Sequence, residues 1–264
     1  MGGAIFDLDT TQRLQIVEQL NTQSLTDIEN STISTNVALS DSTRSAIVFD
    51  YLPGTVQEIQ TIDRLFQAAN WQTTTKLGLA ALEEQFKQLE QEQSPKNLHI
   101  ATQGYFYGQS KNGRKVPDNA RGRIIAANNL LIRSGLALTG ANYAWKEEKN
   151  IDDLEDGILT AYDIATLRLP DTRLVVLSAC ETALGDVVNG EGVFGLQRAF
   201  KLAGVDEMLI SLWKVPDTET AELMQSFYSF YLQNGDASQS LHQAQLAMSK
   251  KYRSFYWAGF VLVK

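Results

Sequence analysis

Cys180 is the one thiol of the chain, and only His99 and His242 could supply an imidazole. A cysteine attacks as its thiolate, and peptide cleavage also needs a group that exchanges protons near neutral pH. One cysteine cannot form an internal disulfide, and one cysteine with two histidines cannot assemble a zinc site of Cys and His ligands. The residue types therefore argue against a disulfide framework and against such a zinc site, and they fit a reducing compartment. A lone cysteine after an apolar run is by itself most often a small core residue, and a nucleophile is the alternative.

Two apolar runs are placed to position this chemistry. Residues 97–102 and 174–177 are typical of buried strands; Gln103 and Gly104 follow the first, and Cys180 follows the second. Continuous apolar strands that alternate with helices predict an α/β fold with a mainly parallel sheet covered on both faces. In such folds reactive groups gather beyond the carboxyl ends of the strands, so we expect these three residues to lie at one edge.

The remaining elements follow from turn residues and hydrophobic spacing. Thr55 and Glu58 have capping-box spacing at the start of a predicted helix. We predict a polar, loosely patterned N-terminal arm over 1–45 and one domain over 46–264. The other predicted helices cover 79–89, the stretch through Leu196 and Phe200 to Gly204, 218–232 and 237–250; the other predicted strands cover 46–49, 71–75, 208–212 and 258–263; and a long basic loop covers 107–129.

Composition narrows the possible partners. The 264 residues carry 23 Lys and Arg against 31 Asp and Glu, a net charge of −8, which argues against nucleic-acid binding and against binding to an anionic membrane. The start of the chain carries Asp7 and Asp9 instead of a signal peptide, and no long apolar run follows. We therefore expect a cytoplasmic protein without a membrane partner.

A glycine pattern at 190–195 matches the dinucleotide fingerprint in letters only. Gly190, Gly192 and Gly195 have the required spacing, but the predicted strand ends about a dozen residues earlier, whereas the fingerprint follows its strand directly. No Walker P-loop is present. We expect a turn that opens a helix, and no cofactor.

Six motifs together resemble the CHAT-domain family, bacterial caspase-like domains that are commonly attached to tetratricopeptide repeats. The likeness runs in order from about Leu52 to Val263, and no tetratricopeptide pattern precedes it. The motifs that carry the resemblance are Leu98-His99-Ile100-Ala101-Thr102-Gln103-Gly104-Tyr105-Phe106, Asn129-Leu130-Leu131-Ile132-Arg133-Ser134-Gly135-Leu136-Ala137-Leu138, Glu155-Asp156-Gly157-Ile158-Leu159-Thr160-Ala161-Tyr162, Leu177-Ser178-Ala179-Cys180-Glu181-Thr182, Gly190-Glu191-Gly192-Val193-Phe194-Gly195-Leu196 and Ser211-Leu212-Trp213-Lys214-Val215-Pro216-Asp217.

The resemblance implies a caspase-like α/β/α sandwich and a clan CD cysteine peptidase with a His-Cys dyad. By motif, the nucleophile position is Cys180, and the position of the dyad histidine is occupied by Gln103. The resemblance also implies an oxyanion hole formed by the backbone N–H groups of Gly104 and Cys180. A glutamine amide exchanges no proton near neutral pH. His99 lies about 13 Å along the strand from position 103, and His242 is expected at the surface.

Four further residues are candidates for substrate binding. Ser178 belongs to the nucleophile motif, and the pattern Trp213-x-Val215-x-Asp217 is similar to one in separases, where the acid faces a basic substrate side chain. Asp217 follows a proline before a predicted helix, so it could equally cap that helix. Asp156 is either a turn former or a second pocket acid.

These observations favour a pseudopeptidase, or a strongly impaired peptidase, that binds peptides or protein partners, tetratricopeptide-repeat proteins among the candidates. Two alternatives stay open. The chain could be an active cysteine endopeptidase that uses Cys180 with an unrecognised base, or a structural interaction module whose cleft is unused.

Overall fold

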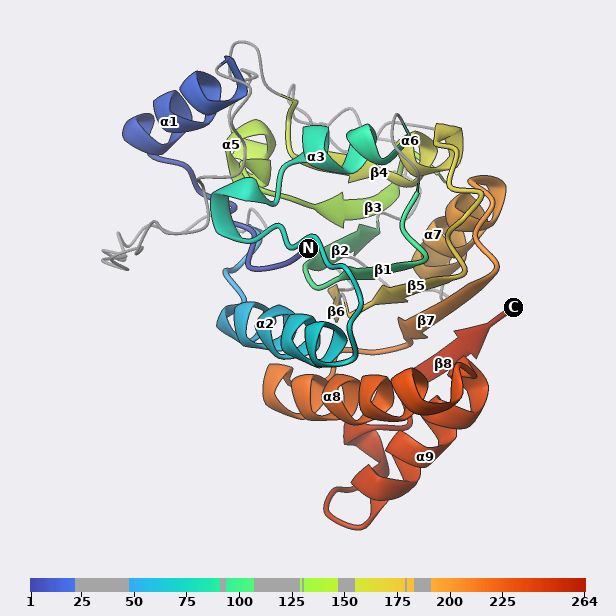
Figure 1. Cartoon of the computed structure of the whole chain (residues 1–264). Coiled ribbons are helices and arrows are strands. Elements are labelled where there is room, and N and C mark those ends of the chain that lie inside the picture. The colour runs from blue at the N-terminus through green and yellow to red at the C-terminus, as the bar shows by residue number, and fades with distance from the viewer. Residues whose placement is uncertain are drawn as a thin grey trace, which may run out of the picture.

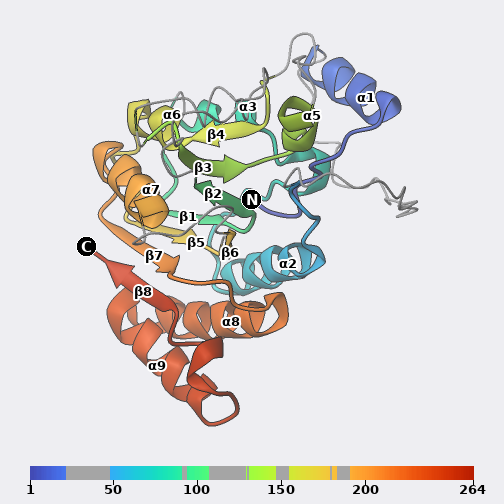
Figure 2. The ribbon, with the colours of Figure 1, turned by 180° about the vertical axis from the view of Figure 1, so that it is seen from behind.

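The computed structural model describes residues 1–21, 48–90, 94–106, 129, 131–146, 155–178, 180–182 and 191–264. Its strands form two four-stranded sheets, seen from opposite sides in Figures 1 and 2. The first contains, in spatial order, β1 (Asn97–Ile100), β5 (Leu174–Leu177), β7 (Glu207–Ser211) and β8 (Phe260–Val263). The second contains β4 (Ile158–Thr160), β3 (Ser134–Ala137), β2 (Gln103–Phe106) and β6 (Cys180–Thr182).

The first sheet is mainly parallel. β1, β5 and β7 run in the same direction, and β8 pairs antiparallel with β7 at one edge. In the second sheet β2 is parallel to β6 and antiparallel to β3, and β4 is antiparallel to β3. In Figure 1 the strands follow one another from β4 near the top to β8 near the bottom.

Two adjacent parallel strands continue from one sheet into the other. β1 leads into β2, and β5 leads into β6, each through a link of two residues. β1 pairs with β5 in the first sheet, and their continuations β2 and β6 pair with each other in the second sheet. Gln103 and Cys180 therefore lie just beyond the carboxyl ends of β1 and β5.

Helices cover both faces of the first sheet. α6 (Ala161–Thr166) and α7 (Glu191–Leu202) pack on the face that carries Val175 and Leu177. On the other face, which carries Leu174 and Val176, lie α2 (Pro53–Ala68), α8 (Asp217–Asn234) and α9 (Ala237–Ser249). Because side chains alternate along β5, this strand contributes residues to both apolar cores, one on each face of the sheet. The predicted α/β sandwich with a mainly parallel central sheet is confirmed.

Shorter elements complete the described part of the chain. These are α1 (Thr10–Asn21), α3 (Glu83–Lys87), α5 (Ala141–Lys146) and the 3-10 turns Gly78–Ala80, Gln88–Glu90 and Ser254–Tyr256. An aromatic group of Phe6, Phe49, Tyr105 and Trp145 joins the N-terminal segment to the second sheet. Residues 22–45 of the predicted arm lie outside the described residues, as do most of the basic loop and residues 46 and 47 of the strand predicted over 46–49. The division at residue 45 therefore stays a prediction.

Three local expectations differ from the structure. The predicted capping box is wrong: α2 begins at Pro53, and the hydroxyl of Thr55 donates to the carbonyl of Leu52. Residues 71–75 form no strand, and 79–89 is divided into α3 and two 3-10 turns. The proline fixes a helical φ two residues earlier than the predicted start.

Candidate active site

Gln103 and Cys180 are direct neighbours across the parallel pair of β2 and β6. Their Cα atoms are partners in the ladder, followed by Gly104 with Glu181 and Tyr105 with Thr182. Neighbouring strands lie about 4.8 Å apart. The sequence-based expectation that these positions meet at one edge is met by the backbone; the side chain of Cys180 lies outside the described part of the chain.

The side chain of Gln103 is fixed by a backbone acceptor. It is 3% exposed, and its Nε2 donates to the carbonyl oxygen of Asp50 at 2.6 Å. An amide nitrogen in this position is a hydrogen-bond donor only. Gln103 therefore ties β2 to the segment before α2 and supplies no titratable group at this point.

Asn142 holds that segment in place. From the start of α5, its Oδ1 accepts the backbone N–H of Phe49 at 2.9 Å. Its Nδ2 donates to the carbonyl of Phe49 at 2.9 Å and to the carboxylate of Asp7 at 2.8 Å. The neighbouring carbonyl of Asp50, which accepts from Gln103, is positioned by this buried amide.

Asp217 approaches the same segment from the other side. It is the first residue of α8, after Pro216 at the N-cap, and its carboxylate accepts the backbone N–H of Gly54. A Cβ at position 54 would lie 2.5 Å from the Cβ of Asp217, so only glycine permits this contact. Burial, followed by the charge of Glu58, raises the pKa of Asp217. Its side chain does not cap α8 itself; it joins the starts of α2 and α8.

The segment 50–54 therefore links two candidate residues that are far apart in the sequence. Its first carbonyl bonds to Gln103, and its last N–H bonds to Asp217. Four residues of extended chain span at most about 14 Å. Asp217 and Gln103 are thus joined through one short segment, and the role of Asp217 in substrate binding stays a prediction.

His99 is committed to a buried polar group. Its Nε2 lies 3.0 Å from Glu58 Oε1, and its Nδ1 lies 3.0 Å from the hydroxyl of Tyr228. Burial lowers the pKa of His99, although the hydrogen bond and charge of Glu58 act in the opposite direction. His242 is exposed on α9, which packs on β8 at the opposite edge of the strand order.

Ser178 and Gly104 lie at the junction of the two sheets. The backbone N–H of Ser178 donates to the carbonyl of Ile100 at 3.0 Å, and its buried hydroxyl has no hydrogen-bond partner among the described residues. Gly104 sits in the interior of β2, between Leu136 and Glu181. Gly104 follows Gln103 directly, whereas Ser178 bonds to Ile100, three residues before Gln103. The roles of Gly104 and Ser178 in oxyanion and substrate binding stay predictions.

Trp213 packs toward the C-terminal segment. Its Nε1 donates to the carbonyl of Phe255 at 2.9 Å, and the two rings are stacked with centroids 6.3 Å apart. A Cβ at position 259 would come within 2.8 Å of the indole. These contacts fix the turn between β7 and α8, and the substrate role of Trp213 stays a prediction.

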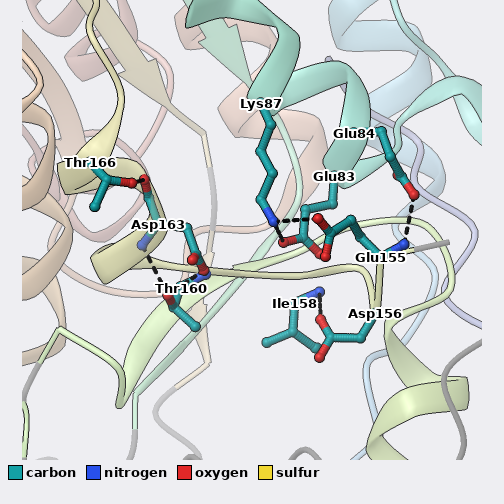
Figure 3. A network of polar contacts seen from close by, with 9 residues as sticks. All are labelled: Glu83, Glu84, Lys87, Glu155, Asp156, Ile158, Thr160, Asp163 and Thr166. Atoms are coloured by element: carbon teal, nitrogen blue, oxygen red, sulfur yellow. Dashed lines mark hydrogen bonds and ion pairs between the residues drawn. The ribbon is translucent and has the colours of Figure 1, made fainter.

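Asp156 forms a turn. Its Oδ1 accepts the backbone N–H of Ile158 at 2.9 Å, and Gly157 between them has a φ of +72°. Figure 3 shows this turn beside α3, where Lys87 Nζ lies 2.9 Å from Glu83 and 2.8 Å from Glu155. The turn precedes β4, which is two strands away from Gln103.

Glu83 is a buried carboxyl in this polar network (Figure 3). Burial, followed by the charge of Asp156, raises the pKa of Glu83 from 4.5 to about 8. Because the pKa of Glu83 is raised in the folded state, the contribution of this carboxyl to stability is fully present below pH 4.5 and is lost as the pH rises through about 8. We expect Glu83→Gln to flatten this loss and to raise the free energy of unfolding by about 1–3 kcal/mol at pH 8.

Chemical denaturation at pH 5 and pH 8 measures this effect. Glu84→Gln is the matched control, because Glu84 Oε1 accepts the N–H of Glu155 and the glutamine keeps an acceptor there. Equal pH dependence in wild type and Glu83→Gln would contradict the prediction.

Sequence reasoning missed the residues that hold the site. Asp50 contributes a backbone carbonyl, which no side-chain pattern reveals. Asn142 and Gly54 have no motif of their own. The sequence predicts Glu58 as part of a helix cap, whereas in the structure its carboxylate bonds to His99, a contact between α2 and β1 that no local pattern reveals.

Comparison with known proteins shows the family of the chain. The CHAT domain family matches residues 10–264. Tetratricopeptide repeat protein 28 of Homo sapiens is 38% identical over 113 residues, and that of Mus musculus is 40% identical over 113 residues. Each match covers 42% of this chain and 4% of the relative, so the chain corresponds to a small part of those proteins. With the family match over nearly its whole length, this chain belongs to the CHAT-domain family.

Proposed function

We propose that this CHAT domain is of the cysteine-peptidase type and binds peptides or protein partners without cleaving them efficiently. The observation that supports this most is the register in which Gln103 is the partner of Cys180. A histidine at position 103 would stand beside the nucleophile position, where a proton-transfer group is needed. Glutamine leaves that position without one.

Neither histidine is a good replacement. Both ring nitrogens of His99 are within hydrogen-bond distance of Glu58 or Tyr228, so the ring is held in the core. His242 lies on α9, beside β8 and away from β2. An active peptidase with an unrecognised base is therefore the less favoured alternative.

The native protein is expected to show no peptide hydrolysis that depends on Cys180. Loss of the general base reduces the rate by a factor on the order of 10²–10⁴, or more where the dyad acts as a unit. Purified protein and its Cys180→Ala variant would be assayed against a diverse peptide library. Turnover by the native chain that Cys180→Ala removes would overturn the proposal.

A thiol-reactive peptide probe separates the three functions. Peptide affinity with slow labelling of Cys180 supports a pseudopeptidase. Rapid labelling of Cys180 supports an active peptidase. The absence of both peptide affinity and labelling supports a structural module.

Specificity for basic side chains is the second part of the proposal. Asp217 is partly buried and linked to Gln103 through 50–54, and an acid in such a position pairs best with Arg or Lys. We expect Asp217→Asn to weaken binding of Arg-containing peptides about tenfold, equivalent to about 1.4 kcal/mol. The asparagine oxygen can still accept from Gly54, so the fold is retained.

Fluorescence anisotropy with Arg and norleucine versions of one peptide measures this preference. Glu219→Gln is the control, since Glu219 is also an acid in the first turn of α8. An unchanged preference in Asp217→Asn would assign this residue a structural role only.

The setting of the domain is proposed from composition and from its relatives. No helix among the described residues is long and apolar enough to cross a membrane. The named relatives are tetratricopeptide repeat proteins of mammals, whereas the resemblance to the family implies a bacterial domain. We propose a cytoplasmic domain whose partners are peptides or proteins, with repeat-containing proteins among them.

A further inference from the structure

Three buried polar side chains from three elements meet on one face of the first sheet. Nε2 of His99, on β1, lies 3.0 Å from Oε1 of Glu58 on α2, and its Nδ1 lies 3.0 Å from the hydroxyl of Tyr228 on α8. Burial lowers the pKa of His99, which favours the neutral ring. A carboxylate only accepts hydrogen bonds, so the neutral ring donates from Nε2 to Glu58 and accepts at Nδ1 from Tyr228. Both contacts of the ring therefore have a fixed direction.

The same three elements carry contacts of the candidate active site. β1 leads into β2, which begins at Gln103, and α8 begins at Asp217. The segment 50–54 leads into α2 and bonds to both residues, through the carbonyl of Asp50 and the N–H of Gly54. Figures 1 and 2 show α2 lying beside α8. A shift of α2 against β1 would therefore move both contacts of this segment.

Glu58 supplies the polar link between α2 and β1. In the described part of the chain, its bond to His99 is the only hydrogen bond between these two elements. Ile62 and Phe66 of α2 make apolar contacts in the core on this face, and such contacts have no preferred direction. α8, in contrast, has a second bond to β1, which the hydroxyl of Tyr231 donates at 3.0 Å. The position of α2 along β1 therefore depends most on Glu58.

Stability alone does not explain a carboxylate at this position. Glu58 is 3% exposed, and a buried charged group loses most of its hydration. Replacing a buried polar pair with apolar side chains of similar size is often neutral or stabilising. After burial, the charge of Glu58 is the second cause that raises the pKa of Asp217, so it opposes ionisation of the acid proposed to bind basic side chains. The property of Glu58 that remains is the direction of its bond to His99.

We propose that Glu58 is a positioning residue of the peptide-binding site. Its bond to His99 fixes α2 on β1. The segment 50–54 then holds Gln103 and Asp217 in the arrangement that binds a peptide. This inference rests on the proposed function for the bound peptide only. The position of 50–54 can be measured without a peptide, so the two proposals can fail separately.

An apolar replacement of all three side chains separates positioning from stability. The variant with Glu58→Leu, His99→Leu and Tyr228→Phe leaves none of the three without its partner, so it should unfold at the same denaturant concentration as wild type or above it. The N–H of Gly54 should nevertheless exchange with deuterium about tenfold faster, measured by NMR. The Arg peptide of the anisotropy assay should bind about tenfold more weakly, because the binding arrangement would be populated about a tenth of the time.

Glu58→Gln identifies which property of the carboxylate acts. Glutamine keeps an acceptor for Nε2 of His99, so this variant should retain the affinity for the Arg peptide and the slow exchange of Gly54. It also removes the charge beside Asp217, whose other charged neighbour is Lys214. Without that charge the pKa of Asp217 is lower, so binding of the Arg peptide should persist to lower pH than in wild type. A merely structural role of Glu58 would not move this pH profile.

Met248→Ala is the control for general destabilisation. Met248 is buried in the same core but lies on α9, so its loss should lower stability without a faster exchange confined to Gly54. If the triple variant does not fold, Glu58→Leu alone is compared with Met248→Ala, and the faster exchange at Gly54 is expected only in Glu58→Leu.

Two results would overturn the proposal. One is equal exchange at Gly54 in wild type and in the folded apolar variant. The other is a loss of affinity in Glu58→Gln as large as in Glu58→Leu, because the hydrogen bond would then not be what positions the segment. Faster exchange at Gly54 in the apolar variant, with no peptide binding by any form, would contradict the proposed function and still support Glu58 as the residue that positions 50–54.

Discussion

Gln103→His is expected to raise the rate of peptide hydrolysis by a factor on the order of 10²–10⁴. The amide nitrogen of Gln103 now donates to the carbonyl of Asp50 at 2.6 Å. A ring nitrogen of histidine can make the same bond, which orients the imidazole and leaves its second nitrogen for proton transfer with the nucleophile. The register with Cys180 already places the two positions side by side.

The measurement is turnover of the peptides that the native chain binds. Gln103→Asn is the matched control, because it keeps an amide and adds no proton-transfer group; it should stay at the native rate. Adding Cys180→Ala to Gln103→His should remove the gained activity. A folded Gln103→His protein that stays inert would mean that the substrate cleft has been lost as well.

Asn142→Ala is expected to lower the free energy of unfolding by about 2–4 kcal/mol, because it leaves buried polar groups without partners. The N–H and carbonyl of Phe49 both bond to this amide, and Asn142 and Phe49 are fully or almost fully buried. The segment that carries the carbonyl of Asp50 would lose its anchor. Denaturant unfolding measures the change.

Asn129→Ala is the control for this substitution. Asn129 is exposed, and its Oδ1 accepts the N–H of Leu131 at 3.0 Å. Removing an exposed bond of this kind costs about 0.5 kcal/mol or less. Equal costs for the two substitutions would show that Asn142 does not hold the segment.

Strands of the first sheet could be predicted from the sequence because runs of apolar residue types indicate buried strands. β5 (LVVL) and most of β7 (EMLIS) are short apolar runs, and the helices α8 and α9 carry apolar residues at helical spacing. The second sheet could not be predicted in this way. β2 and β6 have the sequences QGYF and CET, which have no strand pattern of their own, and they are strands because β1 and β5 lead into them.

The same limit applies to the site. Gln103, Gly104 and Cys180 were placed at one edge from the ends of two apolar runs, and the ladder brings them together. At 71–75 the sequence predicts a strand from β-forming residue types, but in the structure this segment forms no strand. Strand formation depends on a partner, whereas helix formation is more local.

The continuation of β1 and β5 into β2 and β6 also bears on how the chain folds. The strands that pair here come from segments far apart in the chain, so the pairing requires closure of a long loop before its hydrogen bonds can form. Pairings of this kind form slowly, whereas the neighbouring helices α8 and α9 make local contacts. We therefore expect the two halves of the candidate active site to meet late in folding, after the local helix contacts have formed.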